Sequence, residues 1–465
     1  MSKAAETIPL TKLSAQLRGR VLRPGEAGYD EARTVAAGHI DSRPAVIVRP
    51  ATDDDVATTI AFARDTGLPF AVRSGGHSGA GHGTADGGIV LDLRDMKAVE
   101  IDVDGRTAWA EAGVTAGEFT ATAGAHGLAV SFGDTGSVGL GGLTLGGGVG
   151  YLARKHGLTI DSLLAADVVT AGGAVLRVDE RSHPDLFWAI RGGGGNYGVV
   201  TRFQFRLHHV DQVVGGMLVL PATTETVAGF IAAAEAAPDE LTTIANVMNC
   251  PPVPFVADEH HGSLVILAFV CWAGEPQAGL EAIARLVALA PPLANLVRPM
   301  PYPEIYPPDD PDYRPTAVAR TMFVDSVGPD EARTIVERLQ SSDATLRVAQ
   351  LRVLGGAVAR VPADATAYAH RTSRIMVNVA AFYEGPDDRR VRAAWVDELS
   401  AALHQGDDGA YVNFLDDEGP ERVRAAYPGR TWHRLAAVKA TYDPENFFRL
   451  NQNVPPVDGA DPARA

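Results

Sequence analysis

Three glycine runs in the first two hundred residues constrain the fold of this chain more than any other feature. They begin at residues 75, 133 and 192, and each is followed by a short apolar segment that we interpret as a strand. Glycine tolerates backbone conformations that other residues avoid and lets the main chain approach a ligand closely, so successive N–H groups can surround an anion. Three such runs in one domain predict a site for an extended anionic ligand such as a dinucleotide. The alternative is three tight turns that bind nothing.

The charge of the chain excludes several partners. Its 465 residues contain 41 Lys and Arg against 57 Asp and Glu, which leaves a net charge of −16. Such an acidic chain repels phosphate backbones and anionic lipid surfaces, so we expect neither nucleic acid nor a membrane as a partner. The two cysteines, Cys250 and Cys271, are too few for a disulfide framework or a Cys-rich zinc site, and we expect two buried thiols and no metal.

No targeting or membrane segment is recognisable in the sequence. The first twenty residues lack both the apolar core and the twin-arginine pair of an export signal. No stretch approaches the 18 or so consecutive apolar residues that a membrane span needs. We therefore expect a cytoplasmic protein, and the sequence carries no signal for its oligomeric state.

The glycine runs stop near residue 210, where we expect a domain boundary. The predicted domains are residues 1–209, residues 210–408, and a C-terminal segment, 409–465, that returns to the first domain. In the middle domain, amphipathic stretches that predict helices alternate with β-branched stretches that predict strands. The predicted helices are 223–236, 275–290, 330–341 and 389–404, and the predicted strands are 264–270, 318–324, 347–353 and 374–381. The expected fold class is α+β.

One glycine motif is misleading. Residues 193–198 match the GxGxxG pattern of Rossmann domains by letter. That pattern binds a dinucleotide only between a strand and a following helix. Here a predicted helix, 184–190, precedes the motif and a predicted strand, 199–207, follows it, so we reject Rossmann-type NAD binding.

Ordered motifs along the chain resemble the berberine bridge enzyme-like flavoproteins of the vanillyl-alcohol oxidase superfamily. The motifs are RSGGHS at 73–78, VGLGG at 138–142, GGGVG at 146–150, DLFWAIRGGG at 185–194, YVNF at 411–414 and YDPENFFR at 442–449. The resemblance covers about residues 40–210 and 408–456, and bacterial members that act on hydroxynicotine and polyketide intermediates look closest. It implies a two-domain, PCMH-type FAD-binding fold with an antiparallel substrate-domain sheet.

The resemblance also implies FAD, held by the glycine loops and joined through its 8α position to the imidazole of His77. A neutral imidazole nitrogen is a competent nucleophile for such a bond. The further cofactor-binding residues that the resemblance implies are Arg73, Ser74, Gly75, Gly76, Ser78, Gly79, Thr135, Gly136, Val138, Gly139, Gly142, Gly146, Gly147, Gly150, Gly198, Val200, Asn451 and Asn453.

Two positions of the middle glycine run refine these expectations. Many relatives carry a second flavin link through a cysteine three residues before the valine of the VGxGG motif, and this chain has Thr135 there. We therefore predict a single covalent bond, which weakens a large-sugar substrate. Val138 occupies the family position that controls oxygen access, and a small residue there resembles oxidases rather than dehydrogenases.

Tyr411 and Asn413 are the predicted catalytic residues. Oxidation by a flavin needs a hydride acceptor and usually a base for an O–H or N–H proton. Tyr411 matches the family tyrosine that faces the flavin, and a nearby cation could lower its pKa. We expect Asn413 on the same face of a strand, where it could bond the flavin or the substrate. Candidate pocket residues in the middle domain are Tyr302, Tyr306, Tyr313, Met322 and Phe323.

The sequence thus predicts an FAD-dependent oxidase of a small, fairly apolar alcohol or amine, with O2 as acceptor. Three alternatives stay open: a dehydrogenase with another acceptor, a carbohydrate oxidase, and a noncatalytic FAD-binding protein. Oxygen consumption separates oxidase from dehydrogenase, and bleaching of the flavin by a substrate would exclude the noncatalytic alternative.

Overall fold

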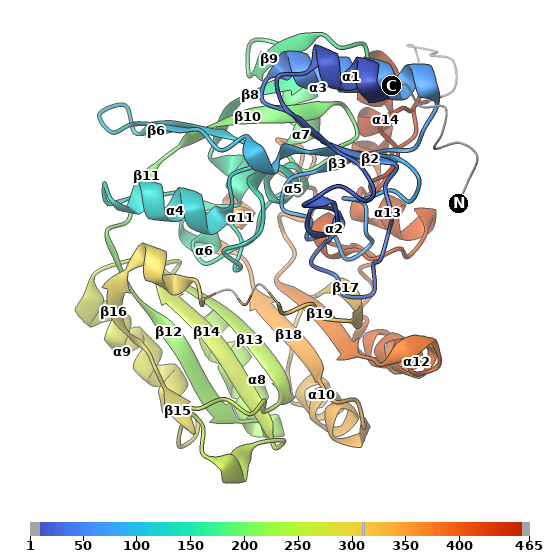
Figure 1. The fold of residues 1–465 in the computed structure, drawn as a ribbon. Coiled ribbons are helices and arrows are strands. Elements are labelled where there is room, and N and C mark those ends of the chain that lie inside the picture. Colours follow the sequence, from blue (N-terminus) through green and yellow to red (C-terminus); the bar gives the residue numbers. More distant parts are fainter. Residues whose placement is uncertain (1–9, 309, 311, 458–465) are drawn as a thin grey trace.

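The structure is a computed structural model that describes residues 10–308, 310 and 312–457. Figure 1 shows an upper part, which we call the loop part, built from both ends of the chain, and a lower part dominated by one large sheet, which we call the sheet part. The red C-terminal helices lie with the blue N-terminal elements (Figure 1).

The first sheet of the loop part positions the first glycine run. Strands β2 and β3 each pair with β4 in parallel, and β1 pairs with β2 antiparallel. Their bounds are β1 (Arg20–Leu22), β2 (Val46–Arg49), β3 (Phe70–Arg73) and β4 (Ile89–Asp92). Helix α3 (Asp53–Thr66) connects β2 to β3, and Thr52 caps it by accepting a hydrogen bond from the backbone N–H of Asp55. The glycine run leaves β3 at its carboxyl end.

The second sheet of the loop part is antiparallel and has the order β5-β6-β10-β8-β9. Its strands are β5 (Val99–Asp102), β6 (Thr107–Glu111), β8 (Leu163–Val169), β9 (Val175–Asp179) and β10 (Val199–Arg206), and β7 (Leu128–Ala129) pairs separately with β11 (His208–His209). The middle glycine run, between β7 and β8, contains the short helix α5 (Leu140–Gly146). The third glycine run follows α7 (Pro184–Ile190) and precedes β10, which confirms the context that excluded a Rossmann site.

The remaining helices of the loop part include two from the C-terminal segment. The remaining helices are α1 (Leu10–Gln16), α2 (Tyr29–Arg33), α4 (Ala116–Gly124) and α6 (Ala153–His156), together with α13 (Pro420–Ala426) and α14 (Arg430–Tyr442) from the C-terminal segment. The fully buried ammonium of Lys439 on α14 donates to Asp443 Oδ2 at 2.6 Å and to the carbonyls of Asn196 and Phe448 at 2.7 and 2.9 Å. A buried charge needs partners of this kind, and these ones fasten the C-terminal segment to the third glycine run.

The sheet part is an antiparallel sheet with the order β15-β12-β14-β13-β18-β19-β17, and β16 also pairs with β12. Its strands are β12 (Gln212–Pro221), β13 (Leu241–Asn249), β14 (Leu264–Trp272), β15 (Ala294–Asn295), β16 (Arg298–Pro301), β17 (Ala317–Val324), β18 (Arg347–Val353) and β19 (Ile375–Phe382). Its helices are α8 (Thr224–Glu235), α9 (Pro276–Val287), α10 (Pro329–Ser341) and α12 (Gly385–Leu403), whereas α11 (Gly356–Arg360) lies against α6 in the loop part. Apolar side chains of α8, α9, α10 and α12 pack on one face of the sheet. The other face turns toward the loop part (Figure 1).

The expected α+β class is confirmed, and so are the four helices and four strands predicted for the middle of the chain, to within a few residues. The sequence analysis did not identify β12 and β13, two buried strands of this sheet. It was wrong about Tyr411 and Asn413: Asn413 lies on a 3₁₀ turn (Val412–Phe414), Tyr411 directly precedes that turn, and neither lies on a strand. Both cysteines are free and buried, as expected. The exact domain boundaries stay a prediction.

Candidate active site

The three glycine runs and the C-terminal segment enclose a cavity of about 440 Å³ in the loop part. Ligand sites of enzymes commonly have this size. Its wall contains Gly75 and Gly76 from the first run, Gly139 and Gly142 from the second, and Gly194, Gly195 and Gly198 from the third. Tyr411 to Leu415 and residues 448, 450, 451 and 452 complete it. The elements that carry the sequence motifs therefore meet at one place.

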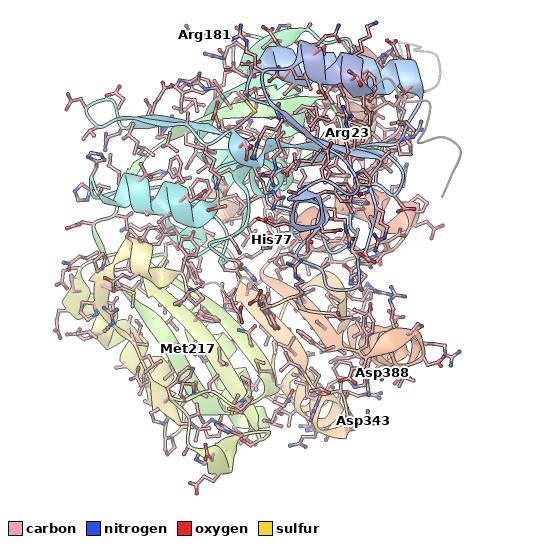
Figure 2. All side chains as sticks on the ribbon, viewed as in Figure 1. Arg23, His77, Arg181, Met217, Asp343 and Asp388 are labelled. Atoms are coloured by element: carbon pink, nitrogen blue, oxygen red, sulfur yellow. The ribbon has the colours of Figure 1, made fainter. Side chains whose placement is uncertain are left out.

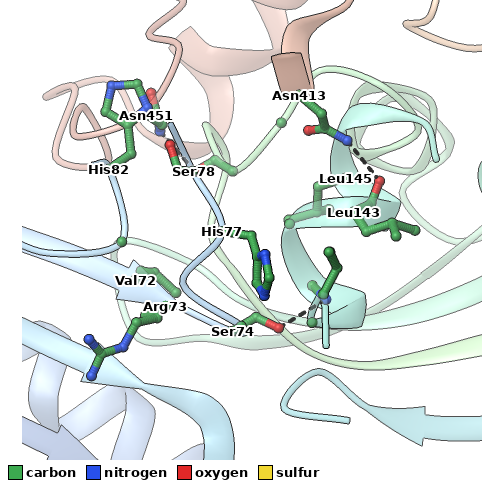
Figure 3. A pocket seen from close by; sticks show the side chains of 18 of the residues that line it. Val72, Arg73, Ser74, His77, Ser78, His82, Leu143, Leu145, Asn413 and Asn451 are labelled. Carbon is green, nitrogen blue, oxygen red and sulfur yellow. Dashed lines mark hydrogen bonds between the residues drawn. The ribbon is translucent and has the colours of Figure 1, made fainter. Parts of the chain in front are cut away.

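The loop after β3 is held so that His77 faces this cavity. Ser74 Oγ donates to the carbonyl of Ala112 at 2.6 Å and accepts from the N–H of Gly141 at 3.2 Å. The backbones touch here, because a Cβ on Gly139 would lie 2.1 Å from Ser74 Oγ and 2.3 Å from the nitrogen of Gly75. The side chain of His77 is exposed and points into the pocket (Figure 3). In Figure 2, His77 lies at the level where the two parts of the molecule meet, above Met217 of the large sheet.

The wall of the cavity fits a dinucleotide with a flat ring system. A Cβ on Gly142 or Gly195 would meet no atom within 4 Å, so these glycines leave their main chain open to a ligand. Apolar side chains such as Leu143, Val199 and Phe448 supply surface for a flat ring. Asn451 Oδ1 is buried without a hydrogen-bond partner among the described residues, and a bound ligand would satisfy it.

The structure brings most of the predicted cofactor-binding residues to this wall. Those lining it are Arg73, Ser74, Gly75, Gly76, His77, Ser78, Thr135, Val138, Gly139, Gly142, Gly198, Val200 and Asn451. Those that do not line it are Gly79, Gly136, Gly146, Gly147, Gly150 and Asn453. Gly146 supports the site from behind, since a Cβ there would lie 2.0 Å from Asn413 Oδ1.

The guanidinium of Arg73 points away from the cavity, although other atoms of this residue line it (Figure 3). It donates to Asp92 Oδ2 at 2.9 Å and to the carbonyl of Ala32. Arg73 and Asp92 are both buried, and Arg49 and Arg94 also bind this carboxylate. The charge of Arg73 therefore holds the strands together behind the loop and does not face a ligand.

Tyr411 is a buried phenol whose oxygen accepts two hydrogen bonds. The N–H of Gly148 donates to it at 2.9 Å and Asn413 Nδ2 at 3.0 Å, and the same amide donates to the carbonyl of Leu143 at 3.1 Å. Burial raises the pKa of Tyr411, while the two hydrogen bonds and the positive charge of Arg352 oppose that rise. The two donors stabilise an oxygen that has lost its proton, as a base requires.

Arg352 on β18 is a residue that the sequence analysis missed. It is buried, forms an ion pair with Asp134, donates to Gln350 Oε1 at 2.8 and 2.9 Å, and lies 5.1 Å from the ring centre of Phe414. Asp134 and Phe414 line the cavity, so Arg352 lies directly behind its wall. The alternating pattern of a strand shows only which side of a sheet a side chain faces. It does not reveal that Arg352 contacts Asp134 and Phe414.

The face of the large sheet toward the loop part carries a row of amides. Asn246, Gln350 and Asn378 are directly opposite one another on β13, β18 and β19. Gln350 Nε2 donates to Asn246 Oδ1 at 2.9 Å, and Asn378 Oδ1 is buried without a partner in the described part of the chain. This row continues the hydrogen bonds of Arg352 across the sheet.

The candidate pocket residues from the middle domain do not line the cavity that the glycine runs enclose. Met322 packs among the helices on the opposite face of the sheet, and Tyr313 is exposed on a loop. Tyr302 and Tyr306 pack beside Tyr151 in a separate cluster. These assignments rested on residue type alone, which cannot tell one face of a sheet from the other.

Among residues 10–308, 310 and 312–457, no helix is long and apolar enough to cross a bilayer. The same residues contain no group of three or more His, Cys, Asp or Glu side chains that could bind a metal ion.

Comparison with known proteins agrees with this geometry. Residues 44–179 match the FAD binding domain family, and residues 410–455 match the family described as berberine and berberine like. An uncharacterised FAD-linked oxidoreductase of Bacillus subtilis is 31% identical, over 95% of this chain and 98% of the relative. (R)-6-hydroxynicotine oxidase of Paenarthrobacter nicotinovorans is 30% identical, over 96% and 98%.

Solved structures give the same result. The crystal structure of 6-hydroxy-D-nicotine oxidase from Arthrobacter nicotinovorans matches with a TM-score of 0.83 at 29% identity, covering 94% of this chain and 98% of the other. The protein is an FAD-linked oxidoreductase. It belongs to the berberine-like family, as the sequence motifs predicted.

Proposed function

We propose that the protein is an oxidase whose FAD is bonded covalently to His77. In this proposal it removes a hydride from a small, fairly apolar alcohol or amine and reduces O2 to H2O2. The observation that carries the proposal is that His77 and Tyr411, from opposite ends of the chain, line one cavity formed by the glycine runs.

The covalent link is supported by the placement of His77. Its imidazole projects into the cavity from a loop whose glycines are packed against the second run (Figure 3). A fixed backbone with an exposed imidazole suits a nucleophile that bonds once and then stays in place. Thr135, where relatives carry a second linking cysteine, also lines the cavity and offers no thiol. A single link follows from these two positions.

Tyr411 is the group proposed to take the substrate proton. FAD, when bound, supplies the hydride acceptor, and the chain must supply the base. The hydrogen bonds from Gly148 and Asn413 fix the phenol oxygen, and Arg352 places a positive charge near it. Once deprotonated, the Tyr411 phenolate can take the proton of a substrate hydroxyl or amine as the hydride leaves, which returns the residue to its neutral phenol.

Oxygen as the acceptor is supported by Val138. This partly buried side chain lines the cavity, and its backbone is fixed by a hydrogen bond from the N–H of Ala116 to its carbonyl at 2.9 Å. A larger side chain on this rigid backbone would extend into the cavity. Hydroxynicotine oxidase, a relative over nearly the whole chain, acts on a small substrate, which supports the same size class here.

The proposal is tested by two half-reactions followed separately. Anaerobic mixing with 6-hydroxynicotine and with a panel of small secondary alcohols should bleach the flavin for at least one of them. Air should then restore the colour and form H2O2. In Val138→Leu, bleaching should keep its rate while reoxidation slows. Rapid bleaching with no reoxidation by air would identify a dehydrogenase and overturn the oxidase assignment.

A further inference from the structure

A second cavity, of about 690 Å³, lies on the outer side of the five-stranded sheet. It shares no residue with the cavity that the glycine runs enclose, in which we propose that the flavin binds. Its wall includes Arg106, His156, Arg206, His208 and His209. We call it the basic cavity. Two arginines and three histidines line this hollow, and no acidic side chain is among its lining residues, although the chain carries a net charge of −16.

Strand pairing brings the two arginines together. Arg206 is opposite Thr107 in the antiparallel pair of β6 and β10, and the N–H of Leu207 donates to the carbonyl of Arg106 at 2.8 Å. Both side chains are exposed. Their spacing is therefore fixed by the sheet, while their guanidinium groups are free to turn toward a ligand.

Neither arginine forms an ion pair with a described residue. Within the residues that the structure describes, neither guanidinium lies within 4.0 Å of a carboxylate oxygen. Arg177 and Arg202, on strands of the same sheet, show the contrast, because they form ion pairs with Asp167 and Glu100. A pair of arginines without such ion pairs, on a fixed backbone, suits an oxyanion, which it can bind through charge-assisted hydrogen bonds.

The histidines complete the wall on the side of α6. The rings of His156 and His208 are stacked with their centres 4.2 Å apart, and Ser162 Oγ lies 3.0 Å from His208 Nε2. His156 Nε2 is buried without a hydrogen-bond partner in the described part of the chain. The pKa of His208 is lowered to about 4, first by burial and then by the charges of Arg206 and Arg106.

We propose that the basic cavity binds the oxyanion group of a small molecule, a phosphate or a carboxylate, through Arg106 and Arg206. This site is independent of the flavin reaction. Two guanidinium groups offer enough donors for a bidentate contact from each side of the anion. A metal ion does not explain the cavity, because no cluster of metal-ligating side chains occurs in the described residues.

The test is isothermal titration calorimetry on the flavin-loaded protein with two probes, inorganic pyrophosphate and citrate, at constant ionic strength. Using the flavin-loaded protein keeps the glycine loops from binding the probe. Saturable binding of pyrophosphate alone would identify a phosphate site, and binding of citrate alone a carboxylate site. Binding of both would support the shared oxyanion chemistry.

The variants locate the binding. Arg106→Gln/Arg206→Gln should weaken it by about tenfold or more for each arginine removed. Arg206→Lys, which keeps the charge, should cause a smaller loss. Arg181→Gln/Arg285→Gln removes the same charge from exposed positions outside the cavity and should leave binding unchanged. The proposal is overturned if neither probe binds, or if the two double variants lose equal affinity.

Discussion

The loop part and the sheet part of this molecule form their sides of the active-site region by different means. The loop part uses main chain, with glycines where a side chain would collide, as at Gly139 against Ser74 and Gly75. The sheet part uses side chains on a regular sheet, in which Arg352 and the amide row face the loop part. The difference separates a side formed by close main-chain contacts from a side formed by hydrogen-bonded side chains on a regular sheet.

The largest effect should come from the point where the two parts meet, at Tyr411. Tyr411→Phe removes the proposed base and should slow flavin reduction by about 10²–10⁴-fold. Stopped-flow absorbance under anaerobic conditions measures this rate.

Tyr368→Phe is the matched control for that variant. The ring of Tyr368 lies 6.1 Å from that of Tyr411, and its buried hydroxyl has no partner among the described residues. Its loss should leave the rate close to that of the unmodified protein. Equal losses in the two variants would show that packing, and not the proton of Tyr411, limits the reaction.

Alanine substitutions at two glycines test whether close main-chain contacts form the loop part's side of the cavity. Gly139→Ala places a methyl group 2.1 Å from Ser74 Oγ and should cost about 1–3 kcal/mol of stability. Gly142→Ala meets no atom within 4 Å, so the protein should keep its stability but bind less flavin because the methyl group enters the cavity. Thermal unfolding and the ratio of flavin to protein absorbance separate the two effects. An equal loss of stability in Gly139→Ala and Gly142→Ala would contradict the claim that close main-chain contacts at Gly139 build the loop part.

The charge of Arg352 tests what the sheet part contributes to the chemistry. Because this charge lowers the pKa of Tyr411, its removal in Arg352→Met should raise that pKa. Less Tyr411 is then deprotonated at a given pH. We expect the rising limb of the rate profile, on which the rate grows as Tyr411 loses its proton, to move up by about one pH unit and the rate at neutral pH to fall about tenfold. Arg352→Lys should restore much of the profile, and an unmoved limb in Arg352→Met would show that the arginine only packs.

The smallest effect should come from the amide row. Gln350→Leu leaves Asn246 and Arg352 without one hydrogen-bond partner each and should cost about 0.5–1.5 kcal/mol in kcat/KM. Because Gln350 lies one step further from the phenol than Arg352, the loss should fall mainly on KM. Steady-state kinetics with the best substrate of the panel would measure it, and a loss confined to kcat would contradict a binding role.

The same comparison explains what can be predicted from the sequence. Glycine loops are encoded in short contiguous motifs, so His77, Val138 and the strands and helices around them are recognisable from local sequence alone. Tyr411 is recognisable too, but its element was wrongly predicted, because YVNF has the alternation of a strand and folds as a 3₁₀ turn. The side chains of Tyr411 and Asn413 are nevertheless neighbours, because Asn413 Nδ2 donates a hydrogen bond to the phenol oxygen at 3.0 Å.

The contributions of the sheet part could not be predicted in this way. Arg352 and Gln350 are ordinary strand residues until the register of β13, β18 and β19 places them opposite Asn246 and beside Asp134. That register depends on pairing between segments about a hundred residues apart, which local patterns do not encode. The basic cavity was missed for the same reason, because Arg106 and Arg206 meet only through the pairing of β6 and β10.

The most direct test of the central claim is acid precipitation of the purified protein, followed by mass spectrometry of the peptide that contains His77. The proposal predicts a yellow pellet and a flavin-modified His77 in the unmodified protein and in His82→Ala, whose residue lines the same cavity. In His77→Ala it predicts a colourless pellet. A white pellet from the unmodified protein, or a yellow one from His77→Ala, would contradict the assignment of His77 as the residue that holds the flavin.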